Sequence, residues 1–242
     1  MRCQAVSEKS EFWNRVILPW EERRYRASRG WMTSLFSSSV QARSRQAVAL
    51  LAPRVAGKTI LEVGCGTGRL AKTFLDLGAR HYIGLDFSSV ALIKAKELGF
   101  RAGLSSRTEF ILASATDLPD LDFDICLSLG LLDWLTPVEI KKFAEATSGS
   151  DFVHSYSEAR AKDLLRLVHE RYVYLKYGRR QDYVPLYYSE GEIRSLLGLD
   201  VEIHRHGSMR FGSLAIRFHG RDARHDRNHD DRRGHDDPLF TQ

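Results

Sequence analysis

Ile60-Leu-Glu-Val-Gly-Cys-Gly-Thr-Gly-Arg-Leu70 is the stretch that decides the fold of this chain of 242 residues. The apolar run Thr59–Val63 predicts a buried strand, which stops at glycines placed at every second position. The residues that follow, Arg69–Leu77, have the apolar spacing of a helix. Glycines lack Cβ and tolerate positive φ, so a ligand can approach the main chain of such a turn closely. The stretch therefore predicts a strand–turn–helix unit with a ligand site at the turn.

The spacing of these glycines disfavours two common nucleotide-binding loops. The dinucleotide fingerprint requires G-x-G-x-x-G, and Arg69 occupies the position of its third glycine. A P-loop requires lysine and then serine or threonine after its last glycine, whereas Arg69 and Leu70 follow Gly68 here. The turn is therefore typical neither of a nicotinamide dinucleotide site nor of a nucleoside triphosphate site.

Strand and helix patterns alternate over residues 58–219, which predicts an α/β fold with a mostly parallel sheet and helices on both faces. The further parallel strands are expected at His81–Asp86, Phe110–Ala113, Phe123–Leu129 and Asp151–Tyr156. The expected helix starts are Ser88 or Ser89, Thr136, Glu158 (with a long helix to Lys176) and Ser189. Val201–His206 and Leu214–His219 are expected to pair as an antiparallel hairpin at the sheet edge, which completes a seven-stranded sheet.

The segment that begins at Glu62, Glu-Val-Gly-Cys-Gly-Thr-Gly, resembles motif I of the class I S-adenosylmethionine-dependent methyltransferases, which have a Rossmann-like fold. The resemblance implies that the cofactor is S-adenosylmethionine and that Glu62 lies beside its methionine end. It also implies that the cofactor is lined by the backbone of Gly64, Cys65, Gly66 and Gly68.

Five later positions extend the expected cofactor site. Asp86 ends the second strand, about 20 residues after the glycine turn, where a carboxylate can accept hydrogen bonds from both ribose hydroxyls. The resemblance continues there and implies that Phe87 lies against the cofactor. After the third strand the family often has an acid, whereas this chain has Ser114 and Ala115, so adenine is expected to rely on a hydroxyl, a backbone NH and packing. Leu129, after the fourth strand, lies in a segment that resembles the family's adenine-packing segment, which implies that it packs on the adenine.

Two candidates for a catalytic base lie where the acceptor is expected, namely Asp133 beyond the fourth strand and His154 within the fifth. A base is needed only when the acceptor carries a proton at the working pH, and histidine titrates near neutrality. Each candidate has a structural alternative, because His154 can be a hydrogen-bonded core residue and Asp133 can cap a turn. The chain lacks the Asn-Pro-Pro-Tyr type of motif, which disfavours adenine and glutamine nitrogens as acceptors.

Residues 1–57 are expected to form a helical lid or cap, since their aromatic residues can cover the cofactor or, alternatively, pack on the sheet. These aromatic residues are Trp13, Trp20, Tyr25, Trp31 and Phe36. Tyr183, Tyr187 and Tyr188 form a possible second pocket wall. This layout is similar to that of small-molecule O-methyltransferases, so the expected reaction is methyl transfer to a small-molecule acceptor at oxygen. An RNA or protein methyltransferase and a non-catalytic cofactor-binding module stay open as alternatives.

Composition indicates a soluble globular chain, with 43% hydrophobic and 28% charged residues. The net charge is +5, and the basic pairs are scattered, which disfavours a nucleic-acid partner. No apolar run approaches the roughly 20 residues of a membrane span, and no signal peptide is recognised, so a cytoplasmic location is expected.

Two further expectations follow from the distribution of residue types. The three cysteines lack the pairing of a metal or redox motif, and no metal site is expected. The methyltransferase domain is expected to span residues 58–219. Residues 220–242 are rich in arginine, aspartate and histidine and are expected to form a disordered polar tail. The oligomeric state is not indicated by any of these patterns.

Overall fold

The computed structural model describes residues 11, 13–17, 31–159, 185–209 and 212–219, the side chains of residues 16–17 and 31–40 excepted. The tail expected at 220–242 lies outside these residues, as does most of the helix expected over Glu158–Lys176. The predicted start of that helix at Glu158 is wrong, because Glu158 forms a β-bridge with Tyr188. The same holds for Trp20, Tyr25 and Tyr183, and for the side chains of Trp31 and Phe36.

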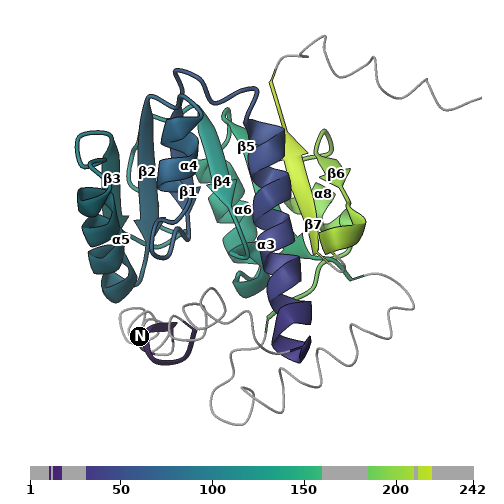
Figure 1. Ribbon diagram of the computed structural model, residues 1–242. Helices are drawn as coiled ribbons and strands as arrows, with labels where there is room; N and C mark the ends of the chain where they lie inside the picture. The colour runs from purple at the N-terminus through teal and green to yellow at the C-terminus, as the bar shows by residue number, and fades with distance from the viewer. Residues whose placement is uncertain (1–10, 12, 18–30, 160–184, 210–211, 220–242) are drawn as a thin grey trace, which may run out of the picture.

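A seven-stranded sheet in the order β3-β2-β1-β4-β5-β7-β6 organises the molecule (Figure 1). Its strands are β1 (Thr59–Val63), β2 (His81–Asp86), β3 (Thr108–Leu112), β4 (Ile125–Ser128), β5 (Asp151–Ser157), β6 (Glu202–His204) and β7 (Gly212–Arg217). The first five strands pair in parallel, and β7 runs antiparallel to both β5 and β6. The predicted mostly parallel sheet with an antiparallel C-terminal pair is therefore confirmed; β1 and β2 have the predicted bounds, and the other strands differ from theirs by one or more residues.

Helices cover both faces of the sheet, because neighbouring residues of each strand point to opposite sides. The helices are α3 (Trp31–Leu51), α4 (Ala71–Asp76), α5 (Ser89–Arg101), α6 (Pro137–Ala146) and α8 (Glu190–Leu197). In β1, Ile60 packs into the core beneath α3, α4 and α5, whereas Leu61 packs into the core beneath α6 and α8. Buried apolar side chains on both faces explain why the parallel strands read as nearly continuous apolar runs.

Side-chain caps begin three of the helices where the sequence predicts them. Ser88 accepts a hydrogen bond from the Ala91 NH at the start of α5. Thr136 and Ser189 each form a complete capping box with the glutamate three residues later, at the starts of α6 and α8. Such caps satisfy backbone NH groups that the first turn of a helix leaves without a partner.

Helix α3 belongs to the core of the sheet domain. Its Ala47 and Leu51 are fully buried in the same cluster as Ile60 of β1. Figure 1 shows α3 lying across the sheet near β5 and β7. The C-terminal part of the segment 1–57 therefore contributes to the core, and a lid role is confined to residues that precede this packing. Within the described residues, every helix is too short or too polar to cross a membrane.

Candidate active site

The glycine turn after β1 is held in place by backbone hydrogen bonds to β2. The NH groups of Gly64 and Cys65 both donate to the Leu85 carbonyl oxygen, at 2.7 and 3.1 Å. Gly68 has a φ of 64°, and a Cβ at this position would lie 2.7 Å from Cε1 of Phe110. Glycine is required here both by the backbone conformation and by the phenyl ring beneath the turn.

Asp86 joins the glycine turn to the end of β2. Its Oδ2 accepts a hydrogen bond from the Gly66 NH and its Oδ1 accepts one from the Ser88 NH, both at 2.8 Å. The residue is 3% exposed, and burial raises the pKa of its carboxyl group although the backbone donors oppose this shift. Each carboxylate oxygen has two lone pairs, so both can still accept a hydrogen bond from a ligand hydroxyl.

Glu62 and Tyr82 form a buried hydrogen-bonded pair at the base of the same turn. The Tyr82 hydroxyl donates to Oε2 of Glu62, and both residues are buried. Burial and the charge of Glu62 raise the pKa of Tyr82 well above its ordinary value, so the phenol stays protonated and continues to donate. Burial likewise raises the pKa of Cys65, which keeps this cysteine a thiol rather than a nucleophilic thiolate.

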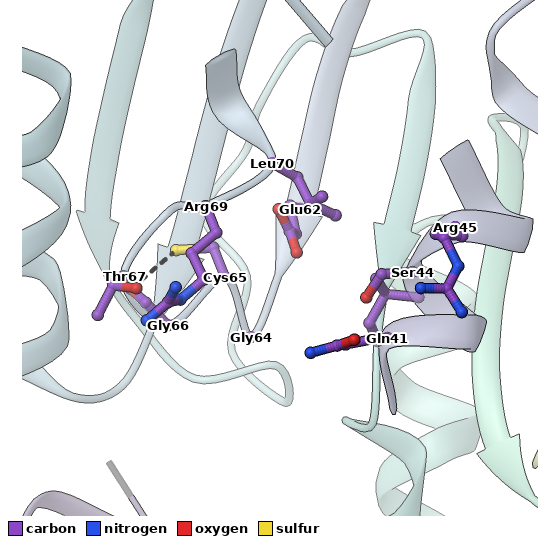
Figure 2. A pocket seen from close by; sticks show the side chains of 11 residues that line it. Gln41, Ser44, Arg45, Glu62, Gly64, Cys65, Gly66, Thr67, Arg69 and Leu70 are labelled. Atoms are coloured by element: carbon purple, nitrogen blue, oxygen red, sulfur yellow. Dashed lines mark hydrogen bonds between the residues drawn. The ribbon is translucent and has the colours of Figure 1, made fainter. Parts of the chain in front are cut away.

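A cavity of about 330 Å³ opens between the glycine turn and α3 (Figure 2). The turn contributes one wall, together with Glu62 and the partly buried Leu129. Helix α3 contributes the other wall through Gln41, Ser44 and Arg45, and the Gln41 amide extends toward the turn in Figure 2. These three residues were not predicted from the sequence, since polar positions on a helix 20 residues before the motif carry no local signal.

The other expected cofactor residues lie along the same edge of the sheet. Phe87 directly follows Asp86, and the Ala113 NH donates to the Asp86 carbonyl oxygen at 3.1 Å, which brings the end of β3 beside the end of β2. The Ser114 hydroxyl lies 3.0 Å from the Thr116 hydroxyl and accepts from the Thr116 NH, so it takes part in a local turn. Ala115 is buried in the core beneath α6 and α8.

Asp133 is held in a buried ion pair with Arg43 of α3. The Arg43 Nη1–Asp133 Oδ2 distance is 3.2 Å, and the two side chains are 6% and 11% exposed. Ser157, at the end of β5, donates its NH to Oδ1 at 2.5 Å and its hydroxyl to Oδ2 at 2.9 Å. The Asp133 carboxylate therefore ties α3 and β5 to the segment after β4, which is a structural task that sequence reasoning did not anticipate.

His154 lies inside the core rather than in the cavity. It is 1% exposed, its ring stacks on Phe152 with centroids 4.5 Å apart, and Phe143 lies 5.0 Å away. Nδ1 lies 3.0 Å from the Ser128 hydroxyl oxygen. Burial and then the positive charge of Arg217 lower the pKa of His154 to about 3. These surroundings favour the core role over the base role that the sequence left open.

The depressed pKa of His154 predicts a dependence of stability on pH. An unfolded chain protonates this histidine below its ordinary pKa of 6.5, whereas the folded chain does so only near 3. The free energy of unfolding should therefore fall as the pH drops below 6.5, with a contribution from this group approaching about 1.4 kcal/mol per pH unit. Urea unfolding between pH 7 and 5 should show a shallower slope for His154→Gln than for the unchanged protein, and identical slopes would contradict the burial of a neutral imidazole.

The short helix η1 (Trp13–Ile17) lies at the carboxyl ends of the parallel strands (Figure 1). The Trp13 ring contacts Phe87 edge to face at 5.5 Å and Trp134 at 5.1 Å, between centroids. The Ser88 hydroxyl donates to Oδ1 of Asn14 at 2.5 Å. This segment therefore bridges the loops that follow β2 and β4, directly beside the residues expected to bind the cofactor.

Residues 60–149 match the family model described as a methyltransferase domain. The ribosomal protein L11 methyltransferase of Alteromonas mediterranea is 38% identical over 74 residues, which are 31% of this chain and 25% of that protein. The tRNA U34 carboxymethyltransferase of Shewanella pealeana is 34% identical over 79 residues, which are 32% of this chain and 24% of that protein. The chain thus spans about a quarter of the length of these curated relatives.

Similarity of fold extends over most of the chain. The crystal structure of magnesium protoporphyrin IX methyltransferase from Synechocystis PCC 6803, with bound S-adenosylhomocysteine, superposes with a TM-score of 0.68 at 17% sequence identity. The superposition covers 88% of this chain and 99% of that structure. The regions before and after residues 60–149 therefore share its arrangement as well.

Proposed function

We propose that this chain is a class I methyltransferase that transfers the methyl group of S-adenosylmethionine to an oxygen atom of a small molecule. The premise is the match of residues 60–149 to a methyltransferase domain, together with the similarity of fold. The observation that carries the proposal is the hydrogen bond between the Gly66 NH and the Asp86 carboxylate. This bond joins the acid after β2 to Gly66, and Gly66 lines the cavity together with Glu62, which supports a site that extends from the cavity to Asp86.

The residues present fit S-adenosylmethionine by their chemistry. Asp86 offers carboxylate lone pairs to the ribose hydroxyls, and Glu62 offers a carboxylate to the α-amino group. The turn presents backbone to the ligand because its glycines have positive φ, including 76° at Gly64 and 54° at Gly66. Phe87 supplies an aromatic side chain beside the ribose acid, and Leu129 supplies apolar contact.

The chemistry that S-adenosylmethionine supplies when bound is an activated methyl group on a sulfonium. The main task of the chain is therefore to hold donor and acceptor in line, and such positioning can contribute about 7–11 kcal/mol. Glu62, Asp86 and the glycine turn hold the donor. Asp133, although proposed from the sequence as a base, already engages Arg43 and Ser157, so we assign it to positioning of the site walls.

The small-molecule acceptor is supported by the cover over the carboxyl edge of the sheet. The Trp13 ring packs against both Phe87 and Trp134 and so covers part of this edge, which favours a small acceptor over an extended RNA or protein chain. On the acceptor side, the Leu186 NH donates to the Asp133 carbonyl oxygen at 2.6 Å, and the Tyr188 hydroxyl donates to the Leu135 carbonyl oxygen. These contacts join the segment before α8 to the loop after β4, which supports a role for this segment as a wall of the acceptor pocket.

The position of Trp13 predicts that η1 acts as a lid on the adenosine half of the site. Trp13→Ala removes two edge-to-face ring contacts, each worth about 0.5–1.5 kcal/mol, and should weaken S-adenosylmethionine binding by about tenfold through faster release. The melting temperature should change little, because Trp13 contacts loops and not the core. Stopped-flow binding would measure the release rate, with Trp13→Phe as the conservative control. An unchanged rate of S-adenosylmethionine release from Trp13→Ala would contradict the role of η1 as a lid.

The proposed function is tested by binding and then by transfer of a labelled methyl group. Calorimetric titration should detect S-adenosylmethionine and S-adenosylhomocysteine but not a nicotinamide dinucleotide. Labelled cofactor is then incubated with separated small-molecule, RNA and protein fractions of a cell extract. Label is expected in the small-molecule fraction, as a methyl ester or ether identified by mass spectrometry. Label in RNA with a steep dependence on salt, or label in protein, would overturn the acceptor proposed here.

A further inference from the structure

We propose that two copies of this chain form a symmetric dimer through the free edge of β3 and the adjoining side of α5, so that the two sheets become one. The proposal goes beyond the proposed function and does not depend on it. β3 is the outermost strand of the sheet, and α5 covers one of its faces (Figure 1). Within the described residues, no strand pairs with the other edge of β3. A strand edge and a helix surface are therefore available side by side to one partner.

The free edge of β3 presents backbone groups in the pattern that antiparallel pairing requires. The Tyr82 NH donates to the Arg107 carbonyl oxygen, so the odd-numbered residues of β3 bond to β2. The NH and carbonyl groups of Thr108, Phe110 and Leu112 therefore point to the free edge. About a two-fold axis at Phe110, the two Phe110 residues exchange both hydrogen bonds, and Thr108 of each copy pairs with Leu112 of the other.

β3 lacks the features by which edge strands usually avoid such pairing. Natural edge strands are often very short, or they carry lysine or proline. β3 has five residues, Thr-Glu-Phe-Ile-Leu, of which only Glu109 is charged. The opposite edge of the sheet, β6, has three residues and carries Glu202 and His204. β3 is therefore the edge that is suited to pairing.

An exposed apolar stripe on α5 adjoins the free edge of β3. Ile93 and Phe100 are 58% and 77% exposed, and the exposed Lys96 lies between them at helical spacing. The buried face of α5 consists of Ala91, Leu92, Ala95 and Gly99. Because α5 is right-handed and connects two parallel strands, the stripe lies on the side of α5 toward the free edge of β3. Leu112 of β3, 61% exposed, extends the stripe onto the sheet.

The stripe is complementary to itself about a two-fold axis. When two α5 helices run antiparallel with the axis between Lys96 and Glu97, Ile93 of each copy faces Phe100 of the other. The same register places Lys96 of each copy beside Glu97 of the other, so opposite charges meet at the rim of an apolar contact. A shift by one residue would bring the two Lys96 side chains together. The pattern of charge and apolar residues therefore selects one register.

The axis required by the helix coincides with the axis required by the strand. A Cβ at Gly99 would lie 3.4 Å from Oγ1 of Thr108 and 3.6 Å from Cε2 of Phe110, which fixes the level of α5 on β3. The midpoint between Lys96 and Glu97 lies about 4 Å closer to the carboxyl edge, within about one residue of Phe110. Since α5 contacts both β2 and β3, the two helices would lie about 10 Å apart, which is a usual packing distance.

The area of the surface fits a reversible dimer. Ile93, Phe100 and Leu112 together expose roughly 400 Å², which is within the range of the largest apolar patches on monomers. With the polar neighbours and the strand edge, two copies would bury about 1,200 Å², the lower bound of a specific interface. A dissociation constant in the micromolar range is therefore expected. The carboxyl edges of the two sheets point in opposite directions, so neither copy covers the cofactor site of the other.

Sedimentation equilibrium of the full chain, over a range of micromolar concentrations, tests the dimer. Phe100→Glu places a charge twice in the apolar contact and should raise the dissociation constant by about 100-fold or more. Val138→Glu is the matched control, because Val138 is 68% exposed on α6 and lies outside the surface. This control should leave the dissociation constant unchanged, and circular dichroism should show both variants folded.

Two further measurements test the register and the strand pairing. Lys96→Glu should raise the dissociation constant by about tenfold, and the double variant Lys96→Glu, Glu97→Lys should restore it, since the swapped charges still meet across the axis. Hydrogen exchange at the NH groups of Thr108, Phe110 and Leu112 should be slower in the dimer than in Phe100→Glu by about tenfold or more.

The outcomes either support or overturn the dimer. A chain that stays monomeric at every concentration would overturn it, including the case in which another part of the chain or another macromolecule covers the surface. A dimer that persists in Phe100→Glu would place the interface elsewhere, and edge amides that exchange equally fast in dimer and monomer would overturn the strand pairing. Loss of the dimer in Phe100→Glu, its recovery in the charge swap and slow exchange along β3 would together support the proposal.

Discussion

Asp86→Ala is expected to weaken S-adenosylmethionine binding by about 100-fold, since it removes two charge-assisted hydrogen bonds of about 1.5 kcal/mol or more each. The structure adds a second cause, because the Gly66 NH loses the acceptor that holds the glycine turn against β2. The Ser88 NH loses its acceptor as well, so the free energy of unfolding should also fall, by about 1–3 kcal/mol. Calorimetric titration at a temperature where circular dichroism shows a folded variant measures the affinity directly.

Two further variants separate the causes of that loss. Asp86→Asn keeps one side-chain oxygen for a backbone NH but lacks the negative charge, so it should retain more stability than Asp86→Ala while binding remains weak. Asp122→Ala removes an exposed acid on the loop before β4 and should leave both quantities unchanged. Affinity equal to that of the unchanged protein in a folded Asp86→Ala variant would place the ribose elsewhere.

The second large effect is expected at the buried pair between Arg43 and Asp133. Removing one member of such a pair leaves the other charge without compensation in the protein interior and costs about 3–5 kcal/mol. Arg43→Met should therefore lower the free energy of unfolding by that amount, since the Asp133 carboxylate would lose the guanidinium and, among the described residues, keep its hydrogen bonds from Ser157. Burial already raises the pKa of Asp133, and Arg43 is the main group that opposes this shift. Urea unfolding at pH 7 measures the loss.

A double-mutant cycle distinguishes the ion pair from lost packing around Arg43. Asp133→Asn alone leaves the guanidinium without its anion, whereas the double variant Arg43→Met, Asp133→Asn leaves neither charge buried. The double variant should be more stable than the sum of the single losses predicts, by about 1–3 kcal/mol. Strict additivity, or a loss below about 1 kcal/mol for Arg43→Met, would mean that the pair contributes little to the fold.

Local patterns in the sequence determined the fold class, and the structure confirms it. The strand–glycine–helix unit, the capping boxes at Thr136 and Ser189 and the antiparallel C-terminal strands all depend on residues close together along the chain. Motif I and the acid after β2 predicted a methyltransferase domain, and residues 60–149 match the model of such a domain. The individual roles of the site residues stay predictions, which the variants above are designed to test.

Only the tertiary structure decided which side chains meet across long separations in the chain. The sequence treated Asp133 and His154 alike as candidate bases, yet Asp133 meets an arginine 90 residues away and His154 is enclosed by Phe143 and Phe152. Helix α3 illustrates the same limit, because its sequence does not show which of its polar residues face the glycine turn. Arg43 is buried in an ion pair and Arg45 lines the cavity, because the packing of α3 turns the first toward Asp133 and the second toward the cavity. The amino-acid sequence by itself therefore determined the type of site. Long-range packing decided which residues form its walls, because burial and charge pairing depend on contacts that local spacing does not encode.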